Sequence, residues 1–259
     1  MIIMLDNLKL PNDTIDKAYD DGLQPAVSEV GKLVGRIPKA INAAFAPLDI
    51  WIAKQENNVA RTKKLLEQNL ENVDPDKIVP PEPYVAVPAI QAISYSANSE
   101  ELRKMYANLL AKSIYADTKN SVHPAFVEII KNLSPVDCHV FEYIMQTGQI
   151  GCYEMRVGSV GKSTYHVSHP YITEMDFSTH DIIAASIDNL LRNKLIVHLD
   201  FHYENDAHYA CIRETDTFKS IEDYYSSFPG NNELRPHKMC IKSTSFGKMF
   251  YKVCCVGIN

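Results

Sequence analysis

The residues between Leu195 and Glu204 have the pattern that most resembles a chemical site. His198, Asp200, His202 and Glu204 occupy every second position. On a strand such residues share one face, with side chains roughly 6.6 Å apart. Two imidazoles and a carboxylate are ligands of zinc or iron, provided that another element closes the site. A solvated strand face is the simpler interpretation, and we predict no metal and no cofactor.

The stretch 158–164 contains Gly161-Lys162-Ser163, which matches the Gly-Lys-Ser at the end of a phosphate-binding loop. That motif requires a further glycine five positions earlier, where this chain has Arg156. An apolar strand before it and a helix after it are also missing from the pattern. We therefore expect a flexible loop here.

Patterns typical of catalytic sites do not occur. The sequence contains no Gly-x-Ser-x-Gly turn, no His-Glu-x-x-His helix and no Cys-His signature. The adjacent carboxylates Glu100 and Glu101 begin a helix, where acidic residues match the helix dipole. We predict no catalytic residues and a protein that is not an enzyme.

Composition narrows the class of protein. The chain has 259 residues, of which 46% are hydrophobic, and a formal net charge of −6. Neither half is basic, so we expect no tight binding to nucleic acid. The start of the chain does not resemble a signal peptide, and no apolar run is long enough to span a bilayer. The six cysteines show no paired spacing, which favours reduced thiols in the cytoplasm.

Residues 1–133 have helical patterns interrupted by prolines. We predict helices over residues 12–22, 25–34, 38–53, 58–73, 88–96, 99–115 and 124–133. Four polar residues lie at or near the apolar faces of these helices, where an unpaired buried group would cost roughly 1 to 3 kcal/mol. We expect these four side chains to form hydrogen bonds between helices. They are Gln91, Arg103, Asn108 and His123.

The predicted helix 38–53 is apolar around most of its surface and contains Phe45 and Trp51. Such a helix belongs in a core. It is too short to cross a membrane, but a concealed membrane-active element is an alternative. We favour the core.

Residues 134–259 mix helices and strands. The patterns predict helices over 134–147 and 180–193, strands over 195–203, 207–213 and 239–242, and a last helix from Thr244. Residues 148–171 show no readable period. This order matches a winged helix. We predict a mainly α protein, with an all-helical domain over 1–133 and a winged-helix domain over 134–259.

The helix 180–193 exposes two acidic residues and one basic residue on its outward face. A helix that reads DNA lies among phosphates, which repel acidic side chains. This face therefore favours docking to a protein over DNA reading. The docking residues that we predict are Asp181, Asp188, Asn189 and Arg192.

The chain resembles the abortive-infection alpha family. The resemblance rests on strings over residues 36–44, 72–79, 82–95, 99–103, 105–111, 122–130 and 133–135. It extends from about residue 25 to the end of the sequence and is strongest between about 35 and 135. It implies bacterial anti-phage defence, and it provides no catalytic residues to carry over.

These observations predict a two-domain defence protein that acts through protein contacts or conformational change. Its partner is an unknown protein or a second copy of the chain, which leaves a homo-oligomer open. The alternatives are a nucleic-acid sensor acting through the winged helix and a membrane effector acting through the helix 38–53.

Overall fold

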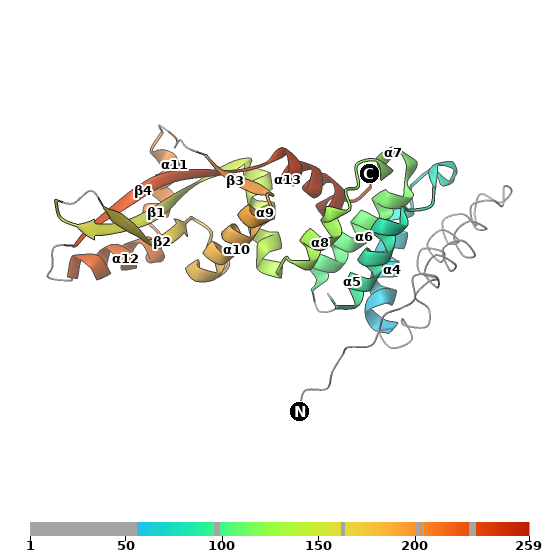
Figure 1. Cartoon of the computed structure of the whole chain (residues 1–259), viewed down its shortest axis with the longest axis horizontal. Coiled ribbons are helices and arrows are strands. Elements are labelled where there is room, and N and C mark those ends of the chain that lie inside the picture. The colour runs from blue at the N-terminus through green and yellow to red at the C-terminus, as the bar shows by residue number, and fades with distance from the viewer. Residues whose placement is uncertain are drawn as a thin grey trace, which may run out of the picture. The chain divides into compact units, whose positions relative to one another are not determined.

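The computed structural model describes residues 56–95, 99–161, 164–199, 203, 205–227 and 232–258 (Figure 1). Its contacts divide the chain into two compact units. The first contains the described residues as far as Asn132 and the carboxyl-terminal segment from Lys252, and the second is Leu133–Tyr251. The helices predicted over 12–22, 25–34 and 38–53 lie outside the described residues.

The first unit is built from helices that pack around α6. In chain order its elements are α4 (Glu56–Leu70), the 3-10 turn η3 (Pro75–Lys77), α5 (Pro83–Tyr95), α6 (Glu100–Ile114), α7 (Ala116–Lys119) and α8 (Ala125–Lys131). The hydroxyl of Ser99 accepts a hydrogen bond from the amide of Leu102 and caps α6. On α4, Thr62, Leu66 and Leu70 are buried at four-residue steps. This spacing produces the predicted apolar stripe.

Helix α5 begins earlier than its sequence predicts. Pro83 is its first residue, where the missing N–H has no helical acceptor to bind. Pro88 lies inside the helix and leaves the carbonyl of Tyr84 without its helical donor. Burial of Val85, Ala89 and other apolar side chains favours the helix despite the two prolines.

The carboxyl-terminal segment completes the first unit. It begins in the π-helical turn η4 (Tyr251–Cys255), in which Val253 and Cys254 are buried. The side-chain amide of Asn108 donates to the carbonyl of Cys254 at 2.9 Å, and that of Asn69 donates to Asn108 at 2.8 Å. Hydrogen bonds from α6 thus hold a segment that is more than a hundred residues distant in sequence.

The second unit is a four-stranded antiparallel sheet with helices between its strands. Its elements are α9 (Pro135–Thr147), β1 (Gln149–Ser159), β2 (Tyr165–Ile172), α10 (His180–Arg192), β3 (Ile196–Leu199), α11 (Ala207–Arg213), α12 (Asp216–Ser227), β4 (Asn232–Ser243) and α13 (Ser245–Phe250). The strand order is β2-β1-β4-β3. Strands β1 and β4 pair over their whole length, from Gln149 opposite Lys242 to Ser159 opposite Asn232.

The short helices α11 and α12 bury an aromatic cluster against the strands. Tyr153 contacts Tyr209 and Phe218 edge to face, with ring centroids 5.4 Å and 5.0 Å away. Such aromatic pairs contribute about 0.5–1.5 kcal/mol beyond the apolar area that they bury. Met155, Ile172, Ile212 and Ile221 complete this core.

The predicted fold class is wrong. Helices and a four-stranded sheet are interleaved along the chain, so a clear all-helical amino-terminal domain followed by a winged helix is not the architecture. The predicted strand 207–213 is helix α11, because Tyr209 and Ile212 face the same core at a helical spacing. Strand β3 pairs with β4 instead of forming a wing. The stretch 148–171, for which the sequence pattern predicted no helix or strand, forms most of the hairpin of β1 and β2.

None of the helices in the described ranges is long and apolar enough to cross a membrane. All six cysteines lie within those ranges, and all are free thiols.

Candidate functional site

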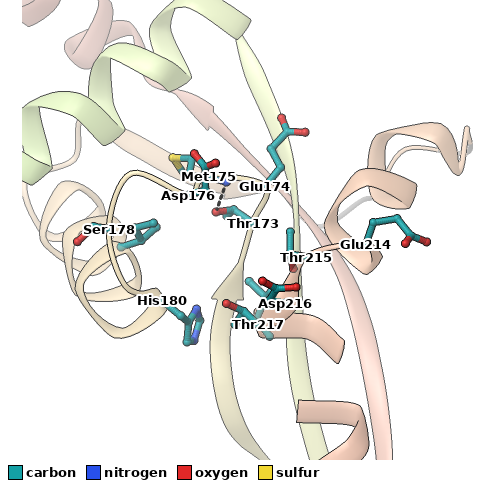
Figure 2. A pocket seen from close by; sticks show the side chains of 12 residues that line it. Thr173, Glu174, Met175, Asp176, Ser178, His180, Glu214, Thr215, Asp216 and Thr217 are labelled. Carbon is teal, nitrogen blue, oxygen red and sulfur yellow. Dashed lines mark hydrogen bonds between the residues drawn. The ribbon is translucent and has the colours of Figure 1, made fainter. Parts of the chain in front are cut away.

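The second unit contains a cavity of about 410 Å³, which we call the acidic cavity (Figure 2). Three segments form it: the end of β2 with the loop that follows, the start of α10, and the junction between α11 and α12. Its lining residues are Ile172, Thr173, Glu174, Met175, Asp176, Ser178, His180, Ile183, Glu214, Thr215, Asp216 and Thr217.

The lining is strongly one-sided in charge. It contains four carboxylates and four side-chain hydroxyls, and the lining residues themselves include neither lysine nor arginine. Walls of one sign concentrate counter-ions, here cations. The hydroxyl oxygens can accept hydrogen bonds from an ammonium or guanidinium group.

Two of the carboxylates already have partners. Glu174 accepts hydrogen bonds from the hydroxyl of Tyr143 and, at 2.8 Å, from the thiol of Cys211. Glu214 forms a 2.8 Å ion pair with Lys219. Figure 2 shows both glutamates pointing away from the other labelled side chains. Asp176 and Asp216 are exposed and are the carboxylates that remain for a ligand.

His180 stands at the start of α10 and lines the same cavity. Its ring is half-buried, and this burial lowers the pKa of the imidazole, with a smaller opposing effect from Asp181. The ring of His169 lies 6.0 Å away and also disfavours a second positive charge. Burial and the neighbouring ring thus both favour the neutral form of His180. In the view of Figure 2, Asp216 and Thr217 are directed toward the His180 end of the cavity.

A strained residue precedes the cavity wall. Tyr171 has a φ of 53°, a left-handed conformation that costs a bulky residue roughly 1 to 3 kcal/mol. Its buried ring lies 5.2 Å from that of His198. Burial raises the pKa of its hydroxyl, and a hydrogen bond to Asp188 raises it further. These contacts hold the turn that leads the chain from β2 into the loop 173–178.

Two exposed apolar side chains are next to lining residues in the sequence. Phe177 lies between the lining residues Asp176 and Ser178, and 46% of it is exposed. Ile182 precedes the lining residue Ile183 on α10 and is also 46% exposed. We call these two residues the apolar rim.

The predicted docking residues lie on α10 outside the cavity lining. Asp181 is exposed, and Asp188 binds the hydroxyl of Tyr171. Arg192 donates to the side-chain oxygen of Asn189 at 2.6 Å, and Asn189 donates to Asp137 on α9. Much of the face thus has contacts within the unit, and its docking role stays a prediction.

The predicted structural polar residues all lie in the first unit. Asn108 joins α4 to the carboxyl-terminal segment, as described above. His123 is exposed, and its Nδ1 accepts the amide hydrogen of Ala125 at 3.1 Å at the start of α8. Arg103 is only 8% exposed, whereas Gln91 is half-buried.

Two other sequence patterns can be placed only in part. His198 lies on β3, but Asp200, His202 and Glu204 are outside the described residues. Within the described ranges, no group of three His, Cys, Asp or Glu side chains is arranged to hold a metal ion. The glycine-rich stretch joins β1 to β2, whereas a phosphate-binding loop leads into a helix. Lys162 and Ser163 are also outside the described residues.

Our sequence interpretation singled out none of the residues that line the acidic cavity. Two short runs could have indicated them. Each run contains both threonine and acidic residues. The runs are Thr173–Asp176 and Glu214–Thr217. The first run lies shortly before α10, and the second joins the end of α11 to the first residues of α12. A fold that brings two such runs together creates an acidic, hydroxyl-rich pocket.

Comparison with known proteins identifies the family. The sequence model described as abortive infection alpha matches residues 54–254, which is most of the chain. No curated protein gives a significant match. No solved structure gives one either. The family match confirms the resemblance seen in the sequence, and the chain belongs to the abortive infection alpha family.

Proposed function

We propose that this chain acts in abortive infection by binding a protein partner, not by catalysis, and that the acidic cavity receives a basic side chain of that partner. Family membership associates the chain with abortive infection and anti-phage defence. The observation that supports the binding step is the one-sided charge of the cavity lining.

A lysine or arginine side chain matches the cavity in charge and in hydrogen bonding. Asp176 and Asp216 supply negative charge, and the hydroxyls of Ser178 and Thr217 supply acceptors. Arginine has five N–H donors in a planar fork and can use several of these acceptors at once. A phosphate group would be repelled by the carboxylates of Asp176 and Asp216 here, so the cavity does not suit a nucleic-acid backbone.

The apolar rim extends this match to the neighbours of the basic residue. Phe177 and Ile182 offer exposed apolar surface and are next to lining residues in the sequence. An apolar residue next to the inserted basic residue would bury part of that surface on binding. Burial of apolar surface contributes roughly 25 cal/mol per Å². The preferred partner segment is therefore both basic and apolar.

A charge-neutralising variant tests the proposal. We expect Asp176→Asn/Asp216→Asn to abolish phage protection in cells expressing the full chain while leaving its thermal unfolding unchanged. The matched control is Glu222→Gln/Asp223→Asn, which removes two exposed charges from α12 outside the cavity. Full protection by the cavity variant would contradict the proposal.

A second substitution separates binding from catalysis. Asp216→Glu keeps the charge and moves the carboxylate by one methylene. A binding site tolerates this change with a small loss of protection. A catalytic carboxylate does not, because misplacement by about 1 Å can reduce a rate about 100-fold. Complete loss of protection in Asp216→Glu, with the protein folded, would therefore contradict the non-enzymatic proposal.

A further inference from the structure

A second cavity, in the first unit, has the opposite charge. Its volume is about 330 Å³, and we call it the basic groove. Helix α4 supplies four of its lining residues and α6 supplies two. The lining residues are Arg61, Lys64, Leu65, Gln68, Glu100 and Arg103.

The four residues from α4 share one face of the helix. Positions 61, 64, 65 and 68 are separated by the three- and four-residue steps that bring side chains into line. Arg61 and Lys64 are exposed, whereas Arg103 on α6 is 92% buried. The groove thus has a buried arginine in its wall and two exposed cations at the surface.

The one acidic lining residue is already paired. Glu100 forms a 2.8 Å ion pair with Lys104, and this hydrogen bond lowers the pKa of its carboxyl. Glu100 also lies in the first turn of α6, a helix of 15 residues. The positive end of the α6 dipole is therefore directed toward the same region.

We propose that the basic groove binds the phosphate group of a nucleotide-sized small molecule. The guanidinium of Arg103 places a positive charge in a buried setting, where its attraction to an anion is stronger than in water. Arg61 and Lys64 complete the neutralisation of a phosphate, which carries about two negative charges near pH 7. The amide of Gln68 and the side chain of Leu65 contact the rest of the ligand. The volume lies in the usual range for small-molecule sites.

This inference goes beyond the proposed function, because it concerns the other unit and a ligand of opposite charge. The experiment is calorimetric titration of the full chain with three probes: inorganic phosphate, a nucleoside monophosphate and the corresponding nucleoside. We expect saturable binding of the first two, weaker at higher salt, and none of the nucleoside. Absence of binding by phosphate and nucleotide, or equal binding of the nucleoside, would overturn the proposal.

Exposed residues provide the decisive variants, because replacing the buried Arg103 can prevent folding. We expect Arg61→Gln/Lys64→Gln to weaken nucleotide binding about tenfold or more, which is at least about 1.4 kcal/mol. The matched control, Lys77→Gln/Lys131→Gln, removes two exposed cations elsewhere in the same unit and should bind as the unmodified chain does. Equal affinities in both double variants would refute the assignment of the site.

Discussion

The side-chain amide of Asn189 on α10 donates a 2.9 Å hydrogen bond to the carboxylate of Asp137 on α9. Asp137 is 4% exposed, and the same carboxylate oxygen accepts the amide hydrogen of Ser134 at 2.6 Å in the capping box of α9. One buried carboxylate therefore both caps its own helix and joins it to the next.

We expect Asn189→Ala to destabilise the second unit by about 1–3 kcal/mol, because the buried carboxylate of Asp137 loses a donor. Urea unfolding followed by circular dichroism measures the change. Asp181→Asn, at an exposed position on the same helix, is the control and should change stability by less than about 0.5 kcal/mol. Equal midpoints for the two variants would show that this hydrogen bond contributes little.

Lys194→Gly should stabilise the protein. Lys194 has a φ of 58°, and hydrogen bonds from Lys194 to Leu191 and from Leu195 to Leu190 close α10 in a motif that favours glycine. Removing the left-handed strain should contribute about 1 kcal/mol. Lys194→Ala keeps that strain, so only the glycine variant should unfold at a higher temperature. A similar gain in the alanine variant would assign the effect to the lost charge.

Gly247→Ala should prevent normal packing of α13. A Cβ at this position would lie 2.0 Å from the carbonyl oxygen of Leu195, which is a backbone atom and cannot rotate away. Forced overpacking of this kind costs about 1–3 kcal/mol or more. Gly148→Ala provides a contrast, because a Cβ there meets no atom within 4 Å and only the φ of 82° opposes it. Thermal unfolding should rank Gly247→Ala as the less stable of the two variants.

Acid should destabilise the second unit through His180 and His198. Burial lowers the pKa of both imidazoles below the ordinary value of 6.5. The unfolded chain therefore takes up protons before the folded chain does as the pH falls from about 7.5. The contribution of these two histidines to the free energy of unfolding should be constant above that range and should fall below pH 6.5. His180→Gln/His198→Gln should have a shallower pH dependence in denaturant titrations, and an unchanged slope would contradict this prediction.

The helices with clear local signals could be predicted from the sequence. Ser99 and Ser134 cap α6 and α9 as their positions suggest, and the amphipathic spacing on α10 marks its buried face. The helix predicted over 180–193 is α10, although the side chain of Thr179 before it makes no capping hydrogen bond. Where periodicity and flanking residues agreed, the bounds were close to the structure.

The strands were harder because their pattern depends on distant partners. The pairing of β1 with β2 shifts register between Tyr153 and Arg156, so its burial does not alternate regularly. Gly151 and Gly158 lie where the rings of Tyr209 and Tyr165 approach the backbone, which conceals the strand in sequence. The acidic cavity was missed for a related reason. Its walls come from segments about forty residues apart, and only the folded sheet brings them together.

The chain leaves the first unit at Asn132 and returns to it at Lys252. During translation the whole of the second unit emerges before the last piece of the first. Until that piece appears, Asn108 and Lys112 lack the carbonyl acceptors of Cys254 and Lys252. The unit that begins first is thus finished last. A stop codon in place of Lys252 would leave the residues of the second unit intact and the first unit incomplete.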